Sequence, residues 1–410
     1  MKIFQILFLI IFVVTTSTAC ASNTGEVSNN LSKNVNHFGW NYFKNLDKSQ
    51  NIFYSPYSIS AAFSIVANGA TGNTQKEILT ALNAKNIAYL NDDFENFRNF
   101  IDENYRVDTI LQAADLILVN KNYIGKGINS KFQKIVQNVY RSEVDAADFT
   151  ENPDAEKARI KNWVAKNTDA FIPNYEATID AETIVDILDV IYFKGKWAST
   201  FDESKTWKSN FTDNDGSKCK VQMMSKTFED SIAYCADEKF MAISIPYKDN
   251  LAAMYVILPR DENNLNVAEM WDAEEISYRE NFLANLKSAP LFDGKVEVFI
   301  PKFELDIKNN LNDSLQAMGI NLAFTDNAEF HNIVKKMHLK ISEANHQAKI
   351  KVDESGTEAA AVTEITMVAL TAAAAPPKTI YFRADRPFLF VIRDVQSDIN
   401  LFAGVVNSLK

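Results

Sequence analysis

The chain has 410 residues, of which 47% are hydrophobic and 23% charged, and it contains only 12 Gly and 10 Pro. This composition excludes collagenous, low-complexity and wholly disordered proteins, and it suffices for a large hydrophobic core. The net charge of −11 comes without a basic block that could follow a phosphate backbone, so a nucleic acid is not an expected partner. The most basic segment is interpreted as a solvated helix face: Lys157, Arg159, Lys161 and Lys166.

Residues 1–21 have the pattern of a secretory signal peptide. Lys2 precedes an apolar run over residues 3–14, and small residues follow up to Ala21. The run is too short to span a bilayer, and no later purely apolar stretch of about 18 residues offers an anchor. We therefore expect cleavage after Ala21, secretion and no membrane attachment. Cleavage after Ala19 is the alternative, because it would leave Cys20 first, as in a bacterial lipoprotein.

Residues 22–410 show neither repeats nor a linker, so we predict one domain although length alone favours two or three. The first half has mainly helical patterns. Thr74 and Glu77 form a capping box in front of apolar residues with helical spacing, and similar spacing recurs around Phe132 and Trp163. These patterns predict helices in the first half of the chain.

The second half has mainly strand patterns. Apolar residues recur at every second position over residues 296–300 and 303–307, on either side of Pro301. Residues 251–258 and 388–392 are nearly continuous apolar runs, as expected for strands covered on both faces. Residues 400–406 are expected to pair with the latter strand. The order of helices first and sheets after predicts the α+β class.

The usual catalytic and metal-binding motifs are absent, including G-x-S-x-G, the phosphate loop, H-E-x-x-H and C-x-x-C. We therefore predict neither a catalytic residue nor a metal site. His338 and His346 would stand about 25 Å apart on one strand, so they are interpreted as hydrogen-bonded structural histidines. Residues 213–216 (DNDG) lack the ligands of a calcium loop and predict a hairpin turn instead.

The sequence contains candidate residues for a disulfide and for N-glycosylation, should the protein be secreted. Beyond the signal peptide only Cys219 and Cys235 remain, and two alternatives stay open for them, a disulfide or two buried thiols. Asn30, Asn210 and Asn312 each begin an N-x-S/T sequon, so they are glycosylation candidates in a eukaryotic source.

Residues 356–377 fit neither core nor ordinary surface. Eight of these 22 residues are Ala, so helix propensity alone favours a helix. Alternation explains more, because residues 357, 359, 361, 363, 365 and 367 form one uncharged face of mostly small residues, whereas Glu358 and Glu364 fall on the other. Such a segment could enter a sheet as a strand, with Gly356 as its hinge.

Residues 351–363 (KVDESGTEAAAVT) resemble the reactive-loop hinge of the serpins, the serine protease inhibitor family. Further stretches resemble the family in the same order: 51–60, 191–197, 221–224, 341–348, 384–394 and 400–406. The resemblance runs from about residue 30 to residue 410. It implies one α+β serpin domain with three β-sheets, about nine helices and an exposed C-terminal reactive loop at about residues 356–377.

The resemblance also implies a mechanism of suicide-substrate inhibition. A protease attacks the loop and forms an acyl-enzyme, and the cleaved loop then inserts into the central sheet and traps the protease. Family register places the reactive bond at Leu370-Thr371, which suits a chymotrypsin-like primary pocket. A bond at Thr371, Ala372 or Ala373 would favour elastase-like targets. The hinge would consist of Glu354, Gly356, Thr357, Glu358, Ala359, Ala360, Ala361, Val362 and Thr363.

The expected partner is an extracellular serine protease in a covalent complex with a monomeric inhibitor. The alternatives are inhibition of cysteine proteases, or a non-inhibitory serpin that acts as carrier, storage protein or chaperone. Small hinge residues favour the inhibitor. Heparin activation is not expected, because residues 74–89 offer only Lys76 and Lys85 against Glu77. No cofactor is implied.

Overall fold

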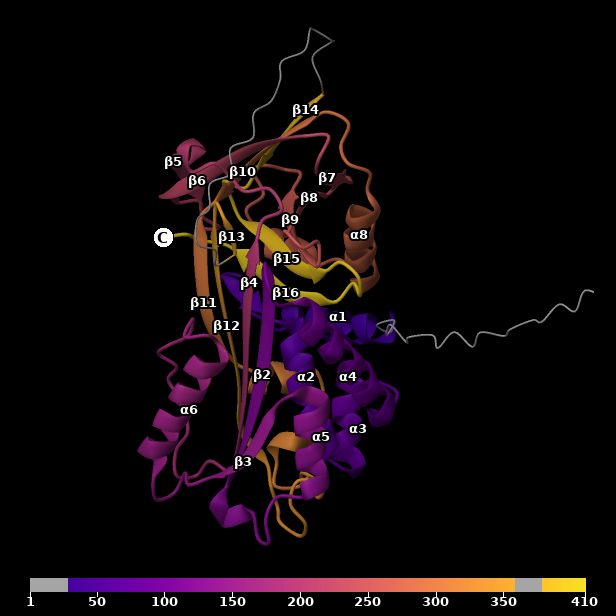
Figure 1. Cartoon of the computed structure of the whole chain (residues 1–410), viewed down its shortest axis with the longest axis vertical. Coiled ribbons are helices and arrows are strands. Elements are labelled where there is room, and N and C mark those ends of the chain that lie inside the picture. The colour runs from indigo at the N-terminus through magenta and orange to yellow at the C-terminus, as the bar shows by residue number, and fades with distance from the viewer. Residues whose placement is uncertain (1–28, 358–377) are drawn as a thin grey trace, which may run out of the picture.

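The computed structural model describes residues 29–357 and 378–410 (Figure 1). The predicted signal peptide (1–21), the hinge residues Glu358–Thr363 and the reactive bond Leu370-Thr371 lie outside the described residues. The described helices are α1 (Asn29–Lys44), α2 (Pro56–Gly69), α3 (Gly72–Ala81), α4 (Ile87–Asn104), α5 (Ser130–Tyr140), α6 (Pro153–Asn167), α7 (Val267–Asp272), α8 (Ile276–Ser288) and α9 (Asn312–Ala317), with 3-10 turns η1 (Lys121–Tyr123), η2 (Glu203–Lys205) and η3 (Leu322–Phe324).

The described strands form three sheets. The central sheet has the order β11-β12-β13-β4-β2-β3, a second six-stranded sheet has the order β1-β16-β15-β9-β8-β7, and a four-stranded sheet has the order β14-β10-β6-β5. The strands are β1 (Ile52–Tyr54), β2 (Thr109–Asn120), β3 (Glu143–Ala147), β4 (Val185–Lys196), β5 (Trp207–Thr212), β6 (Lys218–Glu229), β7 (Ala233–Ala236), β8 (Phe240–Pro246), β9 (Ala252–Pro259), β10 (Lys295–Pro301), β11 (Phe303–Asn310), β12 (Ile341–Asp353), β13 (Gly356–Thr357), β14 (Thr379–Arg383), β15 (Phe388–Asp394) and β16 (Asn400–Val406).

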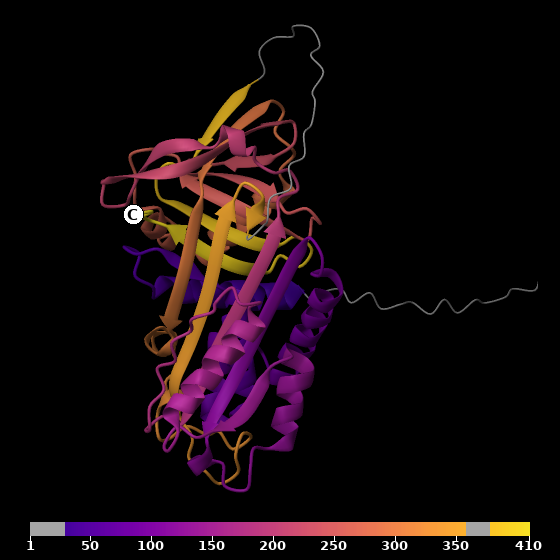
Figure 2. The ribbon, with the colours of Figure 1, turned by 60° about the vertical axis from the view of Figure 1, so that its left-hand side comes forward.

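The central sheet is covered on both faces. Figure 1 shows it nearly edge-on, with α6 on one side and α2 and α5 on the other, and Figure 2 shows its long strands side by side behind α6. Leu118 and Val190 pack with Trp163 in a small core under α6, whereas Ile117 and Ile191 belong to the main core. Successive residues therefore bury opposite faces of the same strand.

The three sheets and nine described helices confirm the predicted α+β fold. Alternation on either side of Pro301 becomes β10 and β11, and β15 pairs antiparallel with β16 as expected. The first half is mainly helical as expected, but it also contains β2 and β4, which pair antiparallel in the central sheet. Apolar residues lie on both faces of these strands and do not alternate strictly with polar ones, so a short stretch of either sequence is compatible with a helix or a strand.

The predicted capping box was also wrong, because both side chains bind distant backbone instead. α3 begins at Gly72, with Thr71 at the N-cap position. Thr74 Oγ1 accepts from the N–H of Glu329 at 3.0 Å, and Glu77 Oε2 accepts from the N–H groups of Asn321 and Leu322. The helix ends at Ala81 and α4 begins at Ile87, so the stretch 74–89 is two helices.

Several local predictions have a clear structural outcome. Residues 213–216 make the predicted hairpin turn between β5 and β6, with Gly216 at φ +82°. His346 is buried and hydrogen-bonded, whereas His338 is exposed and precedes β12. Of the two alternatives for the cysteines, the structure shows free thiols, Cys219 in the four-stranded sheet and Cys235 in the second six-stranded sheet.

The three sequon asparagines differ in their surroundings. Asn30 and Asn210 are exposed. Asn312 is half-buried, and its Nδ2 donates to the carbonyl of Ser342 at 2.9 Å while its Oδ1 accepts from the N–H of Ala344 at 3.1 Å. A glycan on Asn312 would replace one of the two hydrogens of the Nδ2 that donates to Ser342.

Candidate functional site

The candidate site is the gap in the central sheet between β4 and β12. The two strands pair directly, in parallel, from Ile341 and Val185 to Ala348 and Ile191. Beyond that point β13 lies between them, pairing with β12 through Val352↔Thr357 and with β4 through Thr357↔Gly195. The sheet is therefore closed at one end and open at the other, and the first two loop residues already occupy the opening.

Two glycines allow the backbones to approach at this opening. Gly356 has φ +153°, and a Cβ there would lie 2.1 Å from the carbonyl oxygen of Gly195. A Cβ on Gly195 would lie 2.6 Å from the ring of Tyr247. A larger residue at position 356 would therefore clash with the backbone of β4, and one at position 195 would clash with the Tyr247 ring.

Aromatic side chains line the inner wall of the opening. Thr357 is 1% exposed, and its hydroxyl lies 2.7 Å from that of Tyr247. The Tyr247 ring stacks on Trp197 at 4.7 Å between centroids and meets the edge of Phe193 at 5.0 Å. Trp197 Nε1 donates to the carbonyl of Asp353 at 3.0 Å. A small side chain such as Thr357 fits this wall, whereas a large or charged one does not.

Glu354 ties the turn between β12 and β13 to the rest of the molecule. Its carboxylate accepts hydrogen bonds from Lys302 Nζ and from Thr206 Oγ1, both at 2.7 Å. Burial opposes ionisation of Glu354, but the hydrogen bonds from Lys302 and Thr206 outweigh it and lower the pKa of the carboxyl below its ordinary value. Glu354 is therefore ionised when it anchors the turn between β12 and β13.

In the closed part of the gap, Asp189 on β4 binds His346 directly opposite on β12. The N–H of Ser55 donates to His346 Nε2 at 3.1 Å, so Nδ1 carries the proton and donates to Asp189 Oδ2 at 2.8 Å. Ser58 Oγ donates to the other oxygen of Asp189. Both serines come from the N-terminal end of α2, so a helix under the sheet fixes this link across the gap.

Two further buried acids flank this link. Asp115 lies opposite Asp189 on β2, and burial together with the charge of Asp189 raises the pKa of Asp115. Its Oδ2 accepts from Ser142 Oγ at 2.8 Å. Asp186 lies opposite Glu343, and burial followed by the charge of Glu343 raises the pKa of Asp186 to about 7. The closed part of the sheet is thus rich in titrating groups.

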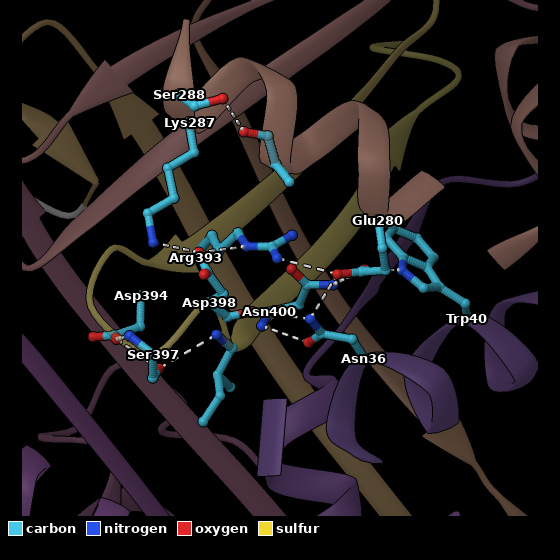
Figure 3. Close-up of polar contacts among 12 residues, drawn as sticks. Asn36, Trp40, Glu280, Lys287, Ser288, Arg393, Asp394, Ser397, Asp398 and Asn400 are labelled. Carbon is cyan, nitrogen blue, oxygen red and sulfur yellow. Dashed lines mark hydrogen bonds and ion pairs between the residues drawn. The ribbon is translucent and has the colours of Figure 1, made fainter. Parts of the chain in front are cut away.

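A second polar cluster lies away from the gap, where α1 and α8 meet the turn between β15 and β16 (Figure 3). Glu280 accepts from Trp40 Nε1 at 2.6 Å, from Asn36 Nδ2 at 2.9 Å and from Arg393 Nη2 at 3.1 Å. A cavity of about 540 Å³ opens beside these groups. Arg393 is 4% exposed and lines this cavity, and its Nη1 has no hydrogen-bond partner among the described residues.

The structure thus brings together only part of the predicted site. Glu354, Gly356 and Thr357 lie at the opening, whereas the rest of the predicted hinge and the reactive bond lie outside the described residues. Sequence reasoning missed the roles of Asp189, Trp197 and Tyr247. Among residues 29–357 and 378–410, no group of three or more His, Cys, Asp or Glu is placed to hold a metal ion, and no helix is long and apolar enough to cross a membrane.

Comparison with known proteins agrees with this geometry. The family model Serpin (serine protease inhibitor) matches residues 33–409. Iris of Ixodes ricinus is 32% identical over 390 residues, covering 92% of this chain and 99% of Iris. The chain therefore belongs to the serpin family, whose members are mostly protease inhibitors rather than catalysts.

Two solved structures show the same fold. The thermophilic serpin tengpin in its native state aligns with a TM-score of 0.82 and 27% identity, over 93% of this chain and 95% of tengpin. Human thyroxine-binding globulin complexed with thyroxine aligns with a TM-score of 0.80 and 26% identity, over 93% of this chain and 98% of that chain.

Proposed function

We propose that this serpin is a secreted suicide-substrate inhibitor of chymotrypsin-like or elastase-like serine proteases. The observation that carries the proposal is the position of β13, which already begins a new strand between β4 and β12. Cleavage of the reactive loop at or near Leu370-Thr371 would free the residues after Thr357 to continue this strand.

The strand registers predict where the inserting loop would pass. Thr357 lies opposite Gly195 on β4 and Val352 on β12, and each later loop residue moves one residue back along both strands. Six residues on, Thr363 would stand between Asp189 and His346. A hydroxyl there could accept from His346 and donate to Asp189, so it would replace the direct link that insertion breaks.

Insertion is favourable because it completes the hydrogen bonding of the sheet. The open ends of β4 and β12 pair with only two loop residues, and a continued β13 would find a hydrogen-bonding partner strand on each side. Residues 359, 361 and 363 would share the inner face with Thr357, and all are Ala or Thr. Small side chains demand little space between strands, so insertion can compete with deacylation of the protease.

The decisive experiment incubates the mature protein with chymotrypsin and with pancreatic elastase. The expected result is an SDS-resistant complex, together with a released C-terminal fragment whose mass identifies the reactive bond. Complete cleavage without a complex would refute the inhibitor proposal. A stable complex with a papain-like enzyme alone would assign the protein to cysteine proteases instead.

Secretion is proposed from the N-terminal sequence. Expression of the full chain in a secreting host is expected to release protein that begins at residue 22. Retention of residues 1–21 in intracellular protein would contradict secretion, and lipid attached to Cys20 would favour the lipoprotein alternative.

Carriage of a small anionic molecule is a second candidate function. It is favoured by Arg393, whose buried guanidinium lines the 540 Å³ cavity with Nη1 unpartnered, and by the likeness to thyroxine-binding globulin complexed with thyroxine. Calorimetric titration with thyroxine tests it. Binding that Arg393→Gln weakens at least tenfold would support a carrier, and the absence of heat with the wild-type protein would remove thyroxine as its ligand.

A further inference from the structure

The exposed face of the four-stranded sheet carries a continuous row of three aromatic side chains and one arginine. Trp207 on β5 meets the edge of Phe299 on β10 at 5.8 Å between centroids. Arg383 on β14 lies 4.2 Å over the Phe299 ring and 5.9 Å from the Tyr381 ring. We call Trp207, Phe299, Tyr381 and Arg383 the aromatic row.

The aromatic row is exposed to an unusual degree for side chains of this size. Tyr381 is 55% exposed and Trp207 is 41% exposed, and they are two of only five large hydrophobic residues so exposed in the described part of the chain. Trp, Tyr and Arg are the residue types that most often dominate the binding energy of protein interfaces. The composition of the row therefore suits a protein partner.

Its position indicates which partner. β14 begins at Thr379, directly after the reactive loop, and forms the edge of this sheet at one end of the molecule (Figures 1 and 2). Nine residue steps separate Leu370 from Thr379, and they span at most about 32 Å. A protease domain of about 220 residues has a radius of gyration of about 17 Å. A protease bound at Leu370 can therefore touch β14.

We infer that the aromatic row is a docking surface for the protease that attacks the reactive loop, an inference that rests on the proposed function. The partner surface would be apolar, to cover Trp207 and Tyr381, and would present a carboxylate to Arg383. Arg383 contacts aromatic rings and forms no ion pair within the described residues, so its charge is available to such a partner. The row would raise the rate of association without changing the insertion that follows.

The test measures second-order association rates with the protease that forms the SDS-resistant complex. The double variant Trp207→Ala/Tyr381→Ala is expected to associate about tenfold more slowly, which corresponds to a loss of about 1.4 kcal/mol. Arg383→Glu is expected to slow association about threefold at low salt, with the difference shrinking as salt rises. The stoichiometry of inhibition should stay unchanged, because the hinge is intact.

The matched control is Tyr89→Ala, which removes a 67% exposed aromatic side chain from α4 and is expected to leave the rate unchanged. Equal rates for the wild type and all variants would overturn the docking surface while leaving inhibition intact. If neither chymotrypsin nor elastase forms a complex, the rate at which either enzyme cleaves the loop is compared among the variants instead. Docking can then be tested even if the inhibitor proposal has failed. Concentration-dependent dimerisation that Trp207→Ala abolishes would assign the row to a second copy instead.

Arg383→Glu and thermal unfolding guard against a structural explanation of the alanine effects. Arg383 is exposed, so its substitution is expected to keep the melting temperature of the wild type. A slower Arg383→Glu variant with wild-type stability supports docking. Slowing confined to variants that also lose stability would count against it.

Discussion

The gap between β4 and β12 has an open end and a closed end, and different chemistry holds each. At the open end, Gly356 and Thr357 fill the gap against aromatic rings, and Glu354 anchors the turn. At the closed end the strands pair directly and His346 binds Asp189 across them. At the open end the aromatic rings leave room only for small side chains. At the closed end, an inserting loop residue would have to replace the hydrogen bond between His346 and Asp189.

The largest expected effect comes from blocking the open end. Thr357→Arg would place an unpaired charge beside Tyr247, where burial without a partner is costly. We expect the stoichiometry of inhibition to rise about tenfold or more, because most molecules would be cleaved before their loop inserts. Titration of the protease checks this, with Thr357→Ser as the control that keeps the hydroxyl. Undiminished inhibition by the Arg variant would contradict insertion at β13.

Removing the closed-end link should destabilise the native protein. His346→Ala leaves the Ser55 N–H and an Asp189 oxygen without partners in a buried site, a loss of about 2–4 kcal/mol. Thermal unfolding measures it. The control His338→Ala removes an exposed histidine outside the strand and should change stability by less than about 0.5 kcal/mol. Equal effects of the two substitutions would show that the Asp189 link does not hold the sheet.

The acids of the closed end should make its stability depend on pH. Because the pKa of Asp186 is raised to about 7, its contribution to stability is present at pH below 4 and is lost as pH rises through 7. Asp186→Asn should therefore stabilise the native protein by up to about 4 kcal/mol at pH 8 and leave it nearly unchanged at pH 4. Thermal unfolding at both values tests this, and a benefit independent of pH would exclude titration of Asp186 as its cause.

The smallest expected effect is at the anchor of the open end. The pKa of Glu354 is lowered from its ordinary value of 4.5 in the folded protein. Its contribution to stability is therefore present at pH above 4.5 and is lost as pH falls through the folded-state pKa. Glu354→Gln should cost about 1 kcal/mol at pH 7, because Lys302 is partly exposed, and less in acid. Asp326→Asn, at the exposed pair with Lys340, is the control. Equal losses for both variants would mean that the hinge anchor is no stronger than a surface pair.

Much of the fold could be predicted from short-range patterns. The strands on either side of Pro301 and the pairing of β15 with β16 follow from alternation, apolar runs and a polar turn. Gly356 and Thr357 could be singled out as residues of the proposed hinge because the family resemblance lies in consecutive residues. By contrast, Thr74 and Glu77 matched a local capping pattern, yet their side chains bind backbone N–H groups about 250 residues away in the sequence. A pattern of neighbouring residues cannot predict such a contact.

The sequence by itself determined the class of fold, the family and the small uncharged face of the reactive loop, because these depend on periodicity and on contiguous motifs. Only the tertiary structure decided that β13 lies between β4 and β12, that Asp189 and His346 close the rest of the gap, and that Trp207 meets Phe299 beside β14. These contacts join residues far apart in the chain, and burial and register, which arise only on folding, give them their chemistry.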